Sequence, residues 1–152
     1  MNRIQDANRI YITACGTSWH AGLIGKYLIE EYAGIPVHVE YASEFRYRKP
    51  IIDSNTVVIG ISQSGETADT VSAVKEIQLK GGDVHGIVNV VGSTIARTCG
   101  QGVYIHSGPE QAVASTKAFT NMTAALLLFS IQIGRTRSFS AEKGKLLINE
   151  MK

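Results

Sequence analysis

The sequence predicts an α/β fold: a three-layer sandwich in which about five parallel strands form a sheet flanked by helices. Short apolar, β-branched runs alternate along the chain with longer segments of helical periodicity, an order typical of a parallel sheet covered on both faces. The turns after these runs are polar, as expected where strands end at a ligand crevice. The chain has 152 residues, 44% of them hydrophobic and 18% charged, which suits one domain with a real core.

The first half of the chain contains three of the expected strands, Arg9–Ala14, Val37–Tyr41 and Thr56–Ile61. A helix is expected over about Trp19–Tyr32, because Gly34 and Pro36 stop it. A short helix opens near Ala42 and is broken by Pro50. The helix expected at Glu66–Lys80 is amphipathic, and the residues that would face the sheet are Val71, Val74, Ile77 and Leu79.

The second half supplies two further strands, Val84–Val90 and Val103–His106. Between them, Ser93 is expected to cap a short helix that ends at Cys99. A long helix is expected over about Ser115–Ile133, and a C-terminal helix over Phe139–Lys152. We therefore expect a single domain over residues 1–152, with its core at about 9–135.

The turn after the third strand has the layout of an anion site. Residues 62–67 read Ser-Gln-Ser-Gly-Glu-Thr. A strand that enters a helix through small residues directs backbone N–H groups and the positive end of the helix dipole into the turn. Ser62, Ser64 and Thr67 add hydroxyl groups and Gln63 adds an amide, all without formal charge. These groups favour a small phosphate ester over an ordinary capped helix, which is the competing interpretation.

Two other phosphate sites fit the sequence less well. After the first strand, residues 15–22 read Cys-Gly-Thr-Ser-Trp-His-Ala-Gly, which lacks the second glycine of the dinucleotide motif. The chain also contains no nucleotide-binding P-loop motif. Small phosphorylated metabolites remain as the favoured ligands.

Composition argues against several other functional classes. The net charge is +2, from 15 basic and 13 acidic residues, so no nucleic-acid partner is expected. Two cysteines and four separated histidines lack metal-ligand spacing, so we expect no metal, no disulfide framework and no cofactor. No apolar run is long enough to span a bilayer, and the start of the chain lacks a secretion signal. We expect a cytoplasmic protein that does not contact a membrane.

Four motifs resemble those of the sugar isomerase (SIS) domain family. They are Cys-Gly-Thr-Ser at 15–18, Ala-Ser-Glu-Phe-Arg-Tyr-Arg at 42–48, Ser-Gln-Ser-Gly-Glu-Thr at 62–67 and Val-Ala-Ser-Thr-Lys-Ala-Phe-Thr at 113–120. The resemblance covers about residues 9–135. It implies a five-stranded parallel sheet of the flavodoxin-like or Rossmann-like kind, with sugar phosphate bound at the strand ends.

The resemblance also implies roles for individual residues. Ser62, Gln63, Ser64 and Thr67 would hold the phosphate of a hexose 6-phosphate. The sugar-binding set would comprise Cys15, Gly16, Thr17, Ser18, Val113 and Ser115, with Ser115 also capping the long helix. Each hydroxyl could instead be only a cap or turn residue. Independently of the resemblance, the candidate base for the proton transfer of an isomerase is Glu110, because it follows the end of the fifth strand.

Two of the motifs, at 42–48 and 113–120, resemble enzymes that make glucosamine 6-phosphate from fructose 6-phosphate and glutamine. Such enzymes add a glutaminase domain and a second SIS domain, which we expect as partners in a longer parent chain; this chain alone is expected to be inactive. The alternatives are a sugar-phosphate-sensing domain of a regulator and a free-standing phosphosugar isomerase. The long helix is apolar around most of its circumference, which predicts a second burial surface. In a parent chain the second SIS domain would cover part of it, and without that domain a second copy would cover it in a homodimer. The alternative is that the sheet and the segment Phe139–Lys152 bury the whole helix within one chain.

Overall fold

The computed structural model describes residues 3–112 and 114–151. The strands are β1 (Arg9–Ala14), β2 (Val37–Tyr41), β3 (Thr56–Ser62), β4 (Asp83–Val88) and β5 (Gly102–Tyr104). The helices are a 3₁₀ turn η1 (Arg3–Asp6), α1 (Gly16–Ala33), α2 (Ala42–Tyr47), α3 (Ala68–Leu79), α4 (Thr94–Cys99), α5 (Lys117–Arg135) and α6 (Ala141–Glu150).

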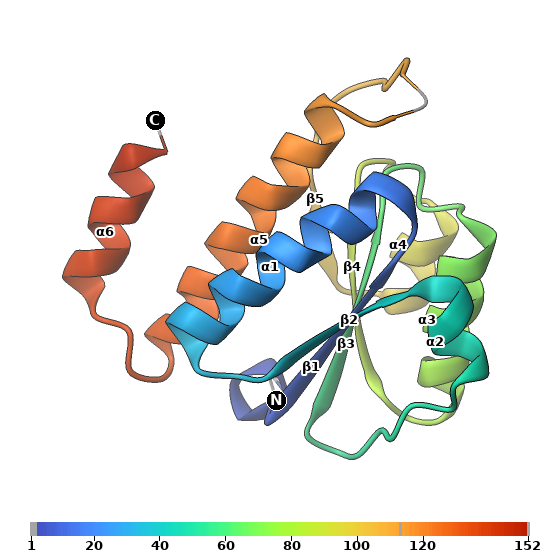
Figure 1. Ribbon diagram of the computed structural model, residues 1–152, viewed down its shortest axis with the longest axis horizontal. Helices are drawn as coiled ribbons and strands as arrows, with labels where there is room; N and C mark the ends of the chain where they lie inside the picture. The colour runs from blue at the N-terminus through green and yellow to red at the C-terminus, as the bar shows by residue number, and fades with distance from the viewer. Residues whose placement is uncertain (1–2, 113, 152) are drawn as a thin grey trace.

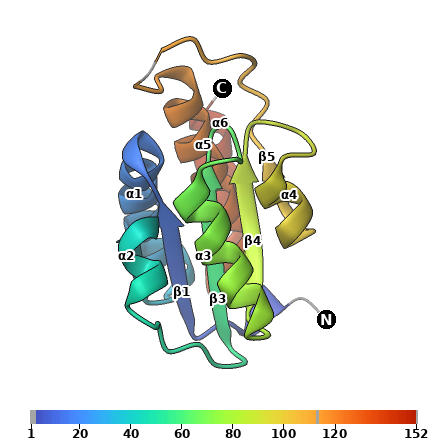
Figure 2. The same ribbon diagram turned by 90° about the vertical axis from the view of Figure 1, so that its right-hand side faces the viewer.

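The five strands form one parallel sheet with the order β2-β1-β3-β4-β5. Helices α1 and α5 cover one face, and α2, α3 and α4 cover the other (Figures 1 and 2). Each crossover from one parallel strand to the next needs a connection long enough to return along the sheet, and a helix supplies it. The predicted three-layer α/β sandwich with a five-stranded parallel sheet is therefore confirmed.

Alternating side chains of the central strands build two separate cores. In β1, Ile10 and Ile12 lie in the core beneath α1 and α5, whereas Tyr11 lies in the core beneath α2, α3 and α4. In β3, Ile59 belongs to the first core and Val58 to the second. Successive side chains of a strand point to opposite faces of the sheet. A strand covered on both sides can therefore be apolar at nearly every position, which is why β3 reads as a continuous apolar run.

Three sequence predictions are corrected by the structure. The fourth strand ends at Val88, not at Val90. The fifth strand ends at Tyr104, not at His106, because His106 has a φ of 47°, which is outside the strand conformation. Leu79 does not face the sheet: it is 89% exposed at the last position of α3, whose buried positions are Thr70, Ala73, Val74 and Ile77. The helical periodicity of apolar residues does not show whether the last residue of a helix still contacts the sheet.

The C-terminal helix lies outside the sandwich. It begins after Ser140, whose hydroxyl accepts the Lys143 N–H at 3.2 Å, so Phe139 precedes it. Its one buried residue among those described is Gly144, and Figure 1 shows α6 standing beyond α5 at the edge of the molecule. On α5, Leu128 is 47% exposed; it lines a hollow beside β5 together with Val103 and Tyr104.

Candidate functional site

The strand register brings the polar turns together at one end of the sheet. Ala14 pairs with Ile61, so the turn that starts at Cys15 lies beside the turn that starts at Ser62. Ser62 pairs with Val88, which places the end of β4 on the other side of Ser62. The connections that follow β1, β3, β4 and β5 all lie at the upper end of the molecule in Figures 1 and 2. The segments that were expected to line a ligand crevice therefore lie at one end of the sheet.

We call the turn over residues 62–67 the phosphate turn, after its proposed ligand. Ser62 supports this turn from its buried side. Its side chain is buried, and its Oγ accepts the N–H of Gly65 at 3.0 Å. The same oxygen lies 3.0 Å from Thr67 Oγ1, and either hydroxyl can donate. A buried hydroxyl that bonds across its own turn fixes the curvature of the backbone. Ser62 therefore supports the turn, while Gln63, Ser64 and Thr67 are partly open to solvent.

Backbone donors at the start of α3 complete the phosphate turn. Thr67 is the N-cap residue, but its hydroxyl bonds to Ser62 and makes no capping bond. The first bond of the helix runs from the Val71 N–H to the Thr67 carbonyl at 2.9 Å. The N–H groups of the first turn before Val71 therefore have no acceptor within the helix, and an anion at this end would be stabilised by them. Ser64 Oγ accepts the Glu66 N–H at 3.1 Å, which leaves its own proton to donate.

The turn after β1 is tighter than expected, because α1 begins at Gly16 and not near Trp19. Gly16 has a φ of 57°, a conformation in which glycine avoids the Cβ clash. Thr17 is half-buried and Ser18 is buried in the first turn of the helix. Thr70 Oγ1 donates to Cys15 Sγ at 3.9 Å, so α3 contacts this turn directly.

The loop between β5 and α5 is the third segment at this end of the sheet. In this loop Glu110 caps the start of α5. Its Oε2 accepts the N–H groups of Thr116 at 3.1 Å and Ala118 at 3.3 Å, and its Oε1 accepts that of Ala112 at 3.5 Å. Ser115 does not cap the helix as expected: α5 begins at Lys117, with Thr116 at the N-cap position. Val113 lies outside the described residues.

The surroundings of Glu110 keep it ionised. Partial desolvation, the largest single influence, raises its pKa. The N–H groups of Ala118, Thr116 and Ala112, together with the charge of Lys117, outweigh that effect and hold the pKa below its ordinary value. A lowered pKa weakens a carboxylate as a proton acceptor near neutral pH. The geometry supports capping, and the catalytic role of Glu110 stays a prediction.

Helix α4 is fastened to the phosphate turn through two residues. Glu66 Oε1 accepts the Thr94 N–H at 2.8 Å, and hydrogen bonding to Thr94 holds the pKa of Glu66 below its ordinary value. The Gly65 carbonyl accepts the Ile95 N–H at 3.0 Å. Ser93 is 3% exposed, and within the described part of the chain its hydroxyl has no hydrogen-bond partner. Ser93 therefore occupies the predicted N-cap position of α4, but its side chain makes no capping bond.

Asn89, which the sequence pattern does not single out, connects the end of β4 to the loop between β5 and α5. Its Oδ1 accepts the N–H of Ser107 at 2.8 Å and the Ser107 hydroxyl at 3.0 Å, while its Nδ2 donates to the Gly108 carbonyl at 2.7 Å. An open hollow of about 440 Å³ lies beside it, lined by Gln63, Asn89, Val90, His106, Gly108 and Pro109. Asn89 could have been recognised as a candidate because it directly follows the end of β4 at Val88. The predicted strand Val84–Val90 includes Asn89 and so treats it as a strand residue.

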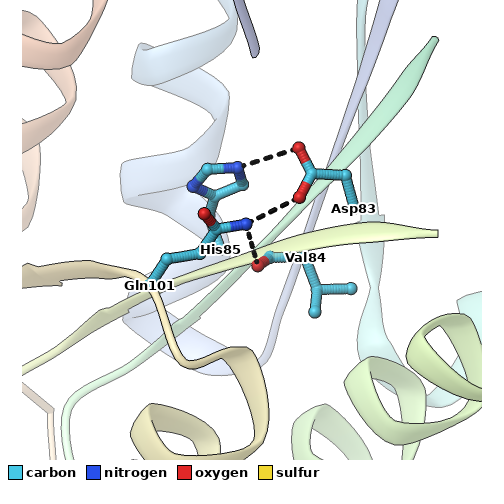
Figure 3. Close-up of polar contacts among 4 residues, drawn as sticks. All are labelled: Asp83, Val84, His85 and Gln101. Carbon is cyan, nitrogen blue, oxygen red and sulfur yellow. Dashed lines mark hydrogen bonds and ion pairs between the residues drawn. The ribbon is translucent and has the colours of Figure 1, made fainter. Parts of the chain in front are cut away.

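A second polar cluster lies at the opposite end of β4 (Figure 3). Asp83 accepts from His85 Nε2 at 3.2 Å and from Gln101 Nε2 at 2.6 Å, and Gln101 also donates to the Val84 carbonyl at 3.2 Å. These bonds attach the segment before β5 to the start of β4, which indicates a structural role.

Two further features, a metal-binding group and a membrane-spanning helix, are absent from the described residues. No group of three or more His, Cys, Asp or Glu side chains within residues 3–112 and 114–151 is placed to hold a metal ion. Among the described helices, none has the length and hydrophobicity that a bilayer crossing requires.

Comparisons with known proteins agree with this architecture. The SIS domain family model matches residues 3–132. The chain is 57% identical over 151 residues to a glutamine–fructose-6-phosphate aminotransferase of Chlorobaculum tepidum, and 56% identical over 135 residues to that of Bacteroides thetaiotaomicron. These matches cover 99% and 89% of this chain but 25% and 22% of the relatives. The chain thus spans about a quarter of the length of these relatives.

Solved structures give the same result. The C-terminal domain of a glucosamine-fructose-6-phosphate aminotransferase from Francisella tularensis superposes with a TM-score of 0.93 at 37% identity, over 97% of this chain and 42% of that one. A glucosamine-6-phosphate deaminase from Thermotoga maritima superposes with a TM-score of 0.78 at 20% identity, over 95% and 44% of the two chains, which shows the fold alone. The fold, the strand-end turns and the family match lead to one conclusion: this chain belongs to the SIS domain family.

Proposed function

We propose that this domain binds a hexose 6-phosphate and serves as the phosphosugar-binding part of a glutamine–fructose-6-phosphate aminotransferase. The observation that carries the proposal is the phosphate turn, where uncharged hydroxyls and the free N–H groups of α3 converge beside the β1–α1 turn. Such a site offers many short hydrogen bonds to a phosphate monoester. The names of the relatives from Chlorobaculum tepidum and Bacteroides thetaiotaomicron support this choice of enzyme.

The proposed binding roles follow from exposure. Gln63, Ser64 and Thr67 are partly open and would contact the phosphate, whereas buried Ser62 holds the turn in shape. Thr17, Ser18, Ser115 and Val113 remain the proposed sugar contacts, with Cys15 and Gly16 forming the turn beneath them. Ser18 is the least accessible of the described members of this set.

The chemical step is proposed to need residues from other parts of a longer enzyme. Glu110 already accepts three backbone N–H groups, so a proton on its carboxyl group would compete with these bonds. We propose that a second SIS domain and a glutaminase domain supply the reactive groups and the ammonia. The isolated domain would then bind sugar phosphate without turning it over.

We also propose that an apolar surface on α1 and α5 is covered in the assembled protein, by a second copy of this chain when nothing else covers it. An open hollow there is lined mostly by apolar side chains, with two threonines and one residue that follows α6: Ile24, Leu28, Phe119, Thr120, Thr123, Ala124, Leu127 and Met151. Exposed apolar patches mark interaction surfaces, and like copies associate most simply about a two-fold axis. Light scattering at micromolar concentration tests this: a monomer of 16.4 kDa would contradict it.

The binding proposal is tested by thermal unfolding with fructose 6-phosphate and glucosamine 6-phosphate. At about 100 times its dissociation constant, a ligand stabilises the folded state by about 2.7 kcal/mol. We expect both sugar phosphates to raise the melting temperature and fructose to leave it unchanged. No shift with either sugar phosphate would refute the proposed site in this domain.

A matched pair of variants locates the site. Ser64→Ala should weaken binding by about 1.5–3 kcal/mol, because a charged phosphate oxygen loses a donor. Ser54→Ala is the control: Ser54 is exposed in the turn before β3, at the other end of the sheet, where its hydroxyl bonds to Asn55. If both variants bound the sugar phosphate equally well, the phosphate would not bind at the 62–67 turn.

A further inference from the structure

Asn89 connects the phosphate turn to the loop between β5 and α5. Its backbone N–H donates to the Gln63 carbonyl at 3.2 Å. Its side chain makes three bonds to that loop, accepting from Ser107 N and Ser107 Oγ and donating to the Gly108 carbonyl. All four bonds are made by one half-buried residue that follows β4. The separation between the two segments therefore depends on Asn89.

The loop segment that Asn89 holds has an unfavourable backbone conformation. His106 has a φ of 47°, in the left-handed region that is unfavourable for a residue with a Cβ. Such conformations persist where the surrounding structure fixes them. The bonds to Ser107 and Gly108, the next two residues, supply that constraint. Without them the loop would relax from its present position.

The same loop leads directly into the proposed sugar contacts. Beyond Gly108, Glu110 holds the N–H groups of Thr116 and Ala118 at the start of α5. Asn121 on α5 donates to the Ile105 carbonyl at 3.3 Å, which fixes the loop at its start. Ser115 lies between these anchors, so its position relative to the phosphate turn is set by Asn89 on one side and by α5 on the other.

We propose that Asn89 is a positioning residue that sets the distance between the phosphate turn and the sugar-contacting loop, and so gives the site its preference for a hexose phosphate over phosphate alone. The inference rests on the proposed function of the site. Phosphate alone needs only the turn, whereas a sugar phosphate must contact both segments at once. A loop that is already fixed avoids the cost of ordering it on binding.

The test compares the dissociation constants of fructose 6-phosphate and inorganic phosphate, measured by ³¹P NMR titration. In Asn89→Ala we expect affinity for fructose 6-phosphate to fall about tenfold, a typical cost of ordering a loop. Affinity for inorganic phosphate should change less than about twofold, because phosphate needs only the turn. Asn55→Ala, an exposed asparagine at the other end of the sheet, is the matched control and should change neither constant.

A second variant tests whether Asn89 acts through the loop. The Ser107 hydroxyl donates to Asn89 Oδ1, so Ser107→Ala removes one of the three side-chain bonds. It should lower affinity for fructose 6-phosphate about two- to threefold in the wild type and not at all in Asn89→Ala, because the two residues share one interaction. This variant also keeps the test available if Asn89→Ala folds poorly.

The outcomes separate the two proposals. If the wild type shows no preference for fructose 6-phosphate over inorganic phosphate, the proposed function fails. If the wild type shows the preference and both Asn89→Ala and Ser107→Ala retain it, the role of Asn89 is refuted while the function stands. Equal loss of affinity for both ligands would also refute positioning, since it would mean that Asn89 supports the phosphate turn itself.

Discussion

Replacing Gly65 with alanine tests whether the phosphate turn depends on close contact with the start of α4. Gly65 has a φ of 68°, and a Cβ placed on it would lie 2.1 Å from Ser93 Oγ and 2.5 Å from Ser93 Cβ. Ser93 cannot move away freely: it is 3% exposed, and its carbonyl accepts the Arg97 N–H within α4. An added methyl group must therefore displace α4 or open the turn.

Two contributions set the size of the effect. The left-handed conformation costs an alanine about 1–2 kcal/mol, and forcing a methyl group into a filled space costs about 1–3 kcal/mol. Gly65→Ala should thus lower the free energy of unfolding by about 2–5 kcal/mol. For a domain of this length, 1 kcal/mol corresponds to about 2–4 °C, so the melting temperature should fall by roughly 4–20 °C.

Gly92→Ala is the matched control for differential scanning calorimetry. Gly92 has a φ of 72°, but nothing lies within 4 Å of the position its Cβ would take. Only the conformational cost of about 1–2 kcal/mol applies there. The double variant Gly65→Ala with Ser93→Gly should recover much of the loss, since it removes both close atoms. Equal melting temperatures for Gly65→Ala and Gly92→Ala would refute the close-contact argument.

Three further predictions concern the same end of the sheet and the core beneath it. Ser62→Ala should destabilise the domain by about 1–3 kcal/mol in urea unfolding, because the buried Gly65 N–H loses its acceptor; an unchanged midpoint would show that the turn does not need this bond. The pKa of Glu110 is lowered in the folded state, so its contribution to stability is present above its ordinary pKa of 4.5 and is lost as pH falls below that value. Glu110→Gln should therefore flatten the acid side of a stability–pH curve, and a curve that kept its slope would contradict the capping role. Burial raises the pKa of the Cys99 thiol to about 12, so a thiol reagent at pH 8 should label half-buried Cys15 before Cys99. Labelling of both cysteines at the same rate in the folded protein would contradict the burial of Cys99.

Most of the fold could be predicted from the sequence, because it depends on local patterns. The strands Arg9–Ala14 and Val37–Tyr41 were predicted at the bounds that the structure shows. Their β-branched residues and the glycine or proline at their ends act over a few residues, within reach of a sequence pattern. Strict alternation of strands and helices then leaves few topologies besides a parallel sheet. The strand-to-helix turn at residues 62–67 could also be predicted, because its residues are contiguous in sequence; its binding of phosphate stays a prediction.

Only the tertiary structure decided which polar residues support the site and which remain open to a ligand. Ser62 and Ser64 look alike in the sequence, yet one is buried beneath the turn and the other is partly exposed. Ser93 resembles a helix cap but lies against Gly65, and Asn89 looks like the end of a strand but bonds to residues 18 and 19 positions later. These contacts join segments that are distant in sequence, and they exist only once the parallel register brings the strand ends together. The sequence determined the local elements, and long-range packing assigned their roles.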